Sequence, residues 1–199
     1  MEQAQVFYGE LKKMADKLLA LNDETIVSLF REDGFRPLPP ENNQPYCGGA
    51  GKMLAFDPDG IAYPCIRYMP SSLGNSIQPI IIGSVDGIYV TDEQKHIKEY
   101  LDSVTRRTQS TDECFYCTVA AGCGNCAAWD YQENGSINKR STNICLMHKA
   151  CSLANVYYWN KWYRQNNINK VFKMHLSKKD ALEIIDGREY EMLAELSKV

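Results

Sequence analysis

The sequence predicts an α+β fold, and three observations support this prediction. Apolar residues recur at helical spacing in 1–31 and again in 144–165, which indicates helices in both regions. Between them, two short apolar stretches flank the sequence Asp-Pro-Asp-Gly at 57–60, a strong signal for the turn of a β-hairpin. A further stretch, 111–128, has no hydrophobic period and carries four of the eight cysteines. We therefore expect a β-hairpin and a Cys-rich loop packed with helices.

The N-terminal segment is expected to be helical. Its apolar residues recur at helical spacing and predict one buried face, made of Val6, Leu11, Met14, Leu18 and Leu21. Asn22 or Asp23 is a suitable N-cap for a second short helix over 25–30. Three prolines in 34–43 then predict a connector without helical period.

The middle of the chain is expected to begin with β-structure. The two strands of the hairpin are predicted at 53–56 and 61–63, and a further short strand is predicted at 79–85. Thr91 and Gln94 then have the spacing of a helix capping box, which predicts a helix that extends to about Arg107.

The last third of the chain is expected to be mainly helical. Asn134-Gly135 marks a turn, and a long helix follows over 144–165. Two stripes should be buried on this helix, one made of Leu146, Ala150, Leu153 and Tyr157, the other of Met147, Cys151, Ala154 and Tyr158. A strand is predicted over 170–175, a helix cap at Ser177, and a last helix over 188–196.

Composition and charge restrict the class of protein. The chain of 199 residues is long enough for one sizeable domain. Lys and Arg number 22 and Asp and Glu number 25, so the net charge of −3 gives no reason to expect a nucleic acid or an anionic membrane as partner. No apolar run approaches the roughly 18 to 20 residues that span a bilayer, and the first residues lack the pattern of a signal peptide. We expect a soluble, cytoplasmic protein.

The eight cysteines are the main chemical feature of the sequence. Without a secretory signal, cysteines are expected to bind metal or do chemistry rather than to form a disulfide framework. Residues 114–126 read CFYCTVAAGCGNC, that is Cys-x2-Cys-x5-Cys-x2-Cys. A Cys-x2-Cys pair lets one tight turn aim two thiolates at one metal centre. Gly122 and Gly124, on either side of Cys123, suit a backbone that approaches a cluster closely or adopts positive φ.

The other four cysteines give separate indications. Cys145 is predicted at the start of the long helix, where unpaired amides and the helix dipole favour a thiolate, although a buried small apolar residue is the alternative. Cys47 and Cys65 flank the hairpin and form a plausible pair. Cys151 lies about 240° around the helix from Cys145 and is expected to be a core residue, with ligation as the alternative. His148, near Cys145, is a candidate supporting donor or occasional ligand, or simply a packed or solvated residue.

The residue types alone leave the metal open, because four-thiolate sites serve both zinc and iron–sulfur clusters. The full order is more specific. It reads Cys47-x12-Gly60-x4-Cys65, then Cys114-x2-Cys117-x5-Cys123-x2-Cys126, then Cys145. This order resembles the seven-cysteine pattern of the SPASM domain, the C-terminal extension of radical SAM enzymes that mature peptides and proteins. The chain has two residues between Cys123 and Cys126 where the family usually has three.

The resemblance implies two auxiliary 4Fe–4S clusters. Position by position, one cluster would be held by Cys114, Cys117, Cys123 and Cys145. The other would be held by Cys47, Cys65 and Cys126, with its fourth position open, filled by a non-cysteine group or supplied by Cys151.

The resemblance also implies a division of the chain. It gives N-terminal helices and a connector over 1–46, which resemble the end of a radical SAM barrel. A cluster-binding domain follows over 47–167, and then a C-terminal extension over 168–199.

One motif of the larger family is absent. Radical SAM catalysis needs Cys-x3-Cys-x2-Cys, and this spacing does not occur in the sequence. The chain is therefore not expected to be catalytic alone. By the resemblance it would serve electron transfer or peptide anchoring, as part or partner of a radical SAM peptide-modifying enzyme. Two alternatives stay open: a structural four-cysteine zinc module for protein interaction, and a degenerate maturase that retains only a peptide-binding surface.

Overall fold

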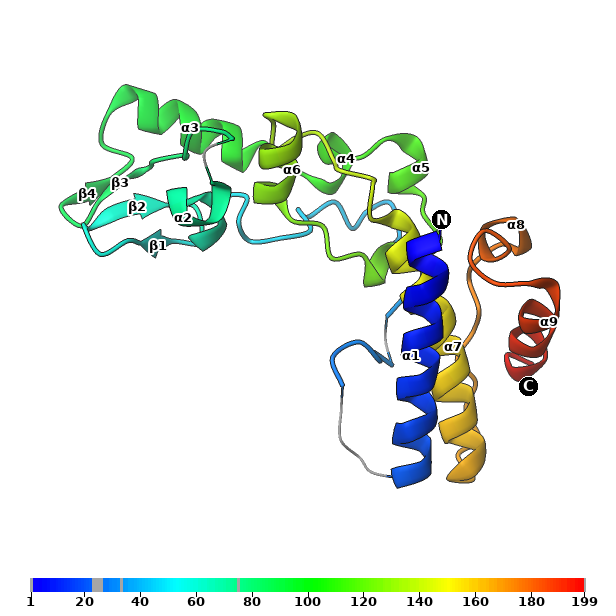
Figure 1. Ribbon diagram of the computed structural model, residues 1–199. Coiled ribbons are helices and arrows are strands. Elements are labelled where there is room, and N and C mark those ends of the chain that lie inside the picture. Colours follow the sequence, from blue (N-terminus) through cyan, green and yellow to red (C-terminus); the bar gives the residue numbers. More distant parts are fainter. Residues whose placement is uncertain (1, 23–26, 33, 75, 199) are drawn as a thin grey trace. The chain divides into compact units, whose positions relative to one another are not determined.

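The computed structural model describes residues 2–22, 27–32, 34–74 and 76–198 (Figure 1). The described part contains helices and a small four-stranded antiparallel sheet, which confirms the α+β class. The chain forms two compact units. Unit 1 contains Met1–Leu38, Tyr116–Cys123 and Asn143–Val199, and unit 2 contains Pro39–Phe115 and Gly124–Thr142. The three-part division implied by the resemblance stays a prediction.

Two long helices form the centre of unit 1. The helices α1 (Glu2–Leu21) and α7 (Cys145–Gln165) lie side by side and run in the same direction (Figure 1). Tyr157 Oη donates to Asp16 Oδ1 over 2.6 Å, and Gln165 Nε2 donates to the Leu19 carbonyl over 3.0 Å. The short helices η2 (Ala120–Gly122) and α8 (Lys178–Ala181) and the C-terminal helix α9 (Gly187–Leu196) complete the unit.

The buried face of α1 differs from the predicted one. The structure buries the side chains of Ala4, Tyr8, Leu11, Ala15 and Leu19. Of the predicted face only Leu11 is fully buried, while Val6 is 61% exposed and Leu21 is 71% exposed. The prediction failed because it gave weight to large aliphatic residues. The two alanines let α1 approach its neighbour closely, and Tyr8 donates from its hydroxyl to Glu189 on α9.

The long helix α7 agrees with the prediction. Both stripes face the hydrophobic core of unit 1: six of their eight residues are fully buried, and Leu146 and Met147 are partly buried against it. The predicted helix over 25–30 lies partly outside the described residues. Residues 27–30 form a turn, in which the Phe30 N–H donates to the Val27 carbonyl. The ring of Phe30 packs on Tyr158 with 4.6 Å between ring centroids.

The predicted strand over 170–175 is wrong. This segment has no regular structure, because a helix side chain takes the place of a neighbouring strand. The buried Asn160 accepts from the Phe172 N–H over 2.8 Å and donates to the Phe172 carbonyl over 2.9 Å. One amide side chain therefore satisfies both backbone groups of Phe172. The predicted cap at Ser177 and the helix that ends at Leu196 are confirmed.

Unit 2 contains the sheet. Its strands are β1 (Ala55–Phe56), β2 (Ile61–Tyr63), β3 (Gly83–Ser84) and β4 (Gly87–Ile88), paired antiparallel in that order. The predicted hairpin is confirmed. Asp57 closes its turn by accepting from the backbone N–H groups of Asp59 and Ile61, and Gly60 has φ of +78°. Of the predicted strand 79–85, residues 83–84 form β3, and Ile82 and Val85 on either side also donate to the carbonyls of Ala62 and Gly60; β4 was not predicted.

Short helices make up the rest of unit 2. They are η1 (Ile66–Tyr68), α2 (Pro70–Leu73), α3 (Asp92–Asp102), α4 (Arg106–Gln109), α5 (Asp112–Phe115) and α6 (Ala127–Asn134). The capping box at Thr91 is confirmed. However, α3 ends at Asp102 instead of Arg107, because Thr105 and Thr108 form a second capping box that starts α4. Gly135 ends α6 with φ of +68°, which confirms the predicted turn.

Candidate metal centres

Three of the predicted ligands lie close together in unit 2. Cys47 follows the connector, Cys65 follows β2 and precedes η1, and Cys126 directly precedes α6. The hairpin between Cys47 and Cys65 returns the chain to its starting point, because β1 and β2 pair in register. Three segments that are far apart in the sequence therefore each contribute one thiol.

Gly49 lies between two of these thiols. Its backbone N–H donates to Cys47 Sγ over 3.3 Å. A Cβ atom at this position would lie 3.3 Å from Cys65 Sγ and 3.6 Å from Cys47 Sγ. The two sulfur atoms are thus no farther apart than the sum of these distances, about 7 Å. The missing side chain at Gly49 leaves space beside both sulfurs.

Burial and the neighbouring thiols disfavour charge on the Cys65 thiol. Cys65 is only 6% exposed. Burial raises the pKa of the Cys65 thiol, the thiols of Cys126 and Cys47 raise it further, and the backbone amides of Arg67 and Tyr68 oppose the shift. A thiolate is the form that binds metal, so a bound cation or cluster would supply the positive charge that the site lacks.

Tyr68 completes this group. The residue is 0% exposed, and its hydroxyl has no hydrogen-bond partner among the described residues. Burial raises the pKa of Tyr68, and electrostatic interactions with Cys65, Cys126 and Cys47 raise it further. Reasoning from sequence did not select Tyr68. The sequence places Tyr68 three residues after Cys65, but it does not indicate whether the hydroxyl has a hydrogen-bond partner, because that depends on the fold.

Three other predicted ligands belong to unit 1. Cys117 and Cys123 are linked by two successive turns, in which Ala120 donates to the Cys117 carbonyl and Cys123 donates to the Ala120 carbonyl. Cys145 is the first residue of α7, as predicted, so it lies at the positive end of a long helix.

Lys149, in the second turn of α7, lies near Cys117. It lies one turn after Cys145 and interacts electrostatically with Cys117. Burial alone would lower the pKa of Lys149, but its hydrogen bond with Asp180 and the nearby negative charges raise it overall. The start of α7 therefore has a lysine near Cys117, and this lysine is paired with Asp180 over 2.6 Å.

The remaining cysteines lie in different surroundings. Cys114 lies in α5, which belongs to unit 2, whereas Cys117, Cys123 and Cys145 belong to unit 1. Each unit is described by itself, so the structure describes no common site for these four. Cys151 is 9% exposed in the hydrophobic core of unit 1, and burial raises the pKa of its thiol to about 11. Its surroundings are those expected for a core cysteine.

The structure explains the glycine before Cys123 differently from the sequence prediction, which was close approach to a cluster or positive φ. Gly122 does not have positive φ. A Cβ atom there would lie 2.3 Å from Cδ1 of Phe35. Close contact with a buried aromatic ring therefore requires glycine at this position.

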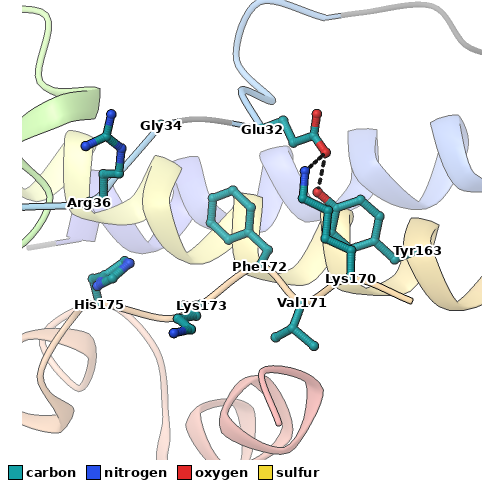
Figure 2. A pocket seen from close by; sticks show the side chains of 9 residues that line it. All are labelled: Glu32, Gly34, Arg36, Tyr163, Lys170, Val171, Phe172, Lys173 and His175. Carbon is teal, nitrogen blue, oxygen red and sulfur yellow. Dashed lines mark hydrogen bonds and ion pairs between the residues drawn. The ribbon is translucent and has the colours of Figure 1, made fainter. Parts of the chain in front are cut away.

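A pocket of about 210 Å³ in unit 1 was not predicted (Figure 2). At one end Lys170 and Tyr163 donate to the carboxylate of Glu32, and these hydrogen bonds lower the pKa of Glu32. At the other end lie Arg36, Lys173 and His175 (Figure 2). Burial lowers the pKa of His175, and the two cations lower it further. The residues that line the pocket include no cysteine, so it is separate from the thiol groups.

Two features are absent from the described residues. No three His, Cys, Asp or Glu side chains in the described part of the chain are arranged to hold a single metal ion. Among the same residues, no helix has both the length and the apolar character needed to cross a membrane. Comparisons with family models, with characterised proteins and with solved structures find no match to the chain.

Proposed function

We propose that the chain is an auxiliary iron–sulfur module of a radical SAM peptide maturase. One 4Fe–4S cluster would be held by Cys47, Cys65 and Cys126. The other would be held by Cys114, Cys117, Cys123 and Cys145, so that the hairpin, the Cys-rich loop and the helices pack around both. The observation that carries the proposal is that thiols from three distant segments meet at Cys65: Cys47 lies beside it across Gly49, and Cys126 is close enough to act on its thiol.

The residues around Gly49 fit such a group. Thiolates are soft donors, which are the ligands of iron–sulfur clusters. The missing side chain at Gly49 leaves room beside two sulfurs, and the buried hydroxyl of Tyr68 has no acceptor among the described residues. A cluster is larger than one ion, so thiols that converge without closing on a single point are compatible with it.

In this proposal the chain is not catalytic alone and serves electron transfer or peptide anchoring. When bound, the clusters would supply one-electron redox chemistry or an iron that anchors a substrate thiolate. A radical SAM domain or subunit and a peptide would be the partners. Free thiols persist in reducing compartments, which agrees with a cytoplasmic location.

Metal analysis after strictly anaerobic purification tests the proposal. We expect about eight iron and eight sulfide per chain, with broad absorbance near 400 nm, since each 4Fe–4S cluster contributes four of each. Two zinc ions and no colour would instead support the structural zinc module and refute the proposal.

Cysteine variants test the ligand assignment. Cys65→Ala and Cys117→Ala should each lose about half of the iron, because they remove ligands of different clusters. Cys151→Ala is the matched control, since it removes a buried thiol from the core of unit 1 and should keep all the iron. Equal iron loss in all three variants would overturn the assignment.

A further inference from the structure

The hydroxyl of Tyr68 is a buried polar group without a partner among the described residues. Tyr68 is the last residue of η1 and is completely buried, yet its hydroxyl has no hydrogen-bond partner within the described residues. Folded proteins leave few buried polar groups unsatisfied, and those that remain often mark the place of a bound group. The partner of this hydroxyl is therefore not among the polar groups that the structure describes.

The surroundings of the hydroxyl restrict where this partner lies. Four negatively charged or ionisable groups act on Tyr68, in decreasing order Cys65, Cys126, Cys47 and Asp130. Asp130 already has partners of its own. Its carboxylate accepts from Asn125 Nδ2 over 2.8 Å and from the Ser141 N–H over 2.7 Å. The three thiols are the remaining groups that act on Tyr68, and the Tyr68 N–H donates to the Cys65 carbonyl over 3.1 Å, so Tyr68 is fixed beside one of them.

We propose that the Tyr68 hydroxyl donates a hydrogen bond to a sulfur of the cluster held by Cys47, Cys65 and Cys126. This inference rests on the proposed function. The acceptor is a cysteine sulfur or a sulfide of the cluster, both of which carry negative charge. A hydrogen bond to such a sulfur stabilises the reduced, more negative state, so Tyr68 raises the reduction potential of this cluster. Tyr68 is a positioning and tuning residue and not a ligand.

The test compares two Tyr→Phe variants of the full chain after anaerobic reconstitution. Tyr68→Phe removes the hydroxyl in question and keeps the ring. Tyr63→Phe is the matched control, because Tyr63 is a buried tyrosine of the same unit whose hydroxyl donates to Asp57 over 2.8 Å. Both changes are made in wild-type and in Cys117→Ala background, where the signal of the other cluster is removed.

Three measurements follow: iron and sulfide content, the midpoint potential by redox titration with electron paramagnetic resonance, and the coupling of exchangeable protons to the reduced cluster in H₂O and D₂O. Tyr68→Phe should keep its iron, shift the midpoint potential to more negative values and lose one exchangeable proton coupling. Tyr63→Phe should match the unsubstituted protein in all three.

The outcomes separate this inference from the proposed function. If the unsubstituted chain takes up no iron, the proposed function fails. If it takes up iron and Tyr68→Phe has the same potential and the same proton couplings, only the role of Tyr68 is refuted. Loss of iron from Tyr68→Phe, with circular dichroism unchanged, would also refute it, because the hydroxyl would then be a ligand.

Discussion

Replacing Gly122 by alanine places a methyl group against the ring of Phe35. The new Cβ atom would lie 2.3 Å from Cδ1 and 2.6 Å from Cε1, far inside van der Waals contact. Phe35 is buried in the core of unit 1 and has φ of +61°, so neither its ring nor its backbone can move freely. Overpacking of a core costs about 1–3 kcal/mol, and we expect Gly122→Ala to fall in the upper half of this range.

The substitution also affects the candidate site. Gly122 directly precedes Cys123 and ends η2, so a shift of the η2 backbone displaces the Cys123 thiol. We expect Gly122→Ala to lower the iron content of the reconstituted chain as well as its stability. Urea unfolding of the metal-free chain, followed by circular dichroism, measures the first effect, and iron analysis measures the second.

A second substitution tests whether the Phe35 ring, and not a bound cluster, is what requires glycine at position 122. Phe35→Leu removes the aromatic atoms that the methyl group would meet. The double variant should therefore be more stable than the sum of the two single effects predicts, by about 0.5–3 kcal/mol, and should recover iron. Gly122→Ala within about 0.5 kcal/mol of the unsubstituted protein would refute the reasoning. So would additive effects in the double variant.

Three further predictions concern Asn160, Gly49 and Cys151. Asn160→Leu leaves both backbone groups of Phe172 without their partner, and should cost about 2–5 kcal/mol in urea unfolding, with faster amide exchange at Phe172; a cost below about 1 kcal/mol would contradict this. Gly49→Ala fills the space beside two sulfurs and should lose about half of the iron, whereas Gly9→Ala, whose Cβ meets nothing within 4 Å, should lose none. The Cys151 thiol has a pKa of about 11, raised by burial, so its alkylation by iodoacetamide should be slow at pH 8 and rise about tenfold per pH unit up to pH 10. Labelling of Cys151 as fast as that of the other cysteines would refute the assignment to the core.

The elements that could be predicted from sequence are those specified by a few neighbouring residues. The turn at 57–60, the capping box at Thr91 and the helix end at Gly135 each depend on local hydrogen bonds or on one positive φ angle. The buried face of α1 and the irregular segment 170–175 depend on partners that are distant in sequence. A hydrophobic pattern gives no information about which distant residues pack against a segment, so both predictions failed.

The candidate site divides in the same way. The resemblance to the SPASM pattern implies that Cys47, Cys65 and Cys126 form one group, and the structure places these three thiols close together. No local pattern could predict the space at Gly49 or the hydroxyl of Tyr68 without a described partner. Both depend on the hairpin, which brings Cys65 back beside Cys47.

The division of the chain into interleaved segments affects how it can be dissected. The backbone passes from one unit to the other four times, after residues 38, 115, 123 and 142. No single truncation isolates either unit. A fragment of 39–115 would keep Cys47 and Cys65 but lose Cys126, which arrives with the returning segment 124–142. To express unit 2 alone, the two segments must be joined by a new linker or produced together as complementary fragments.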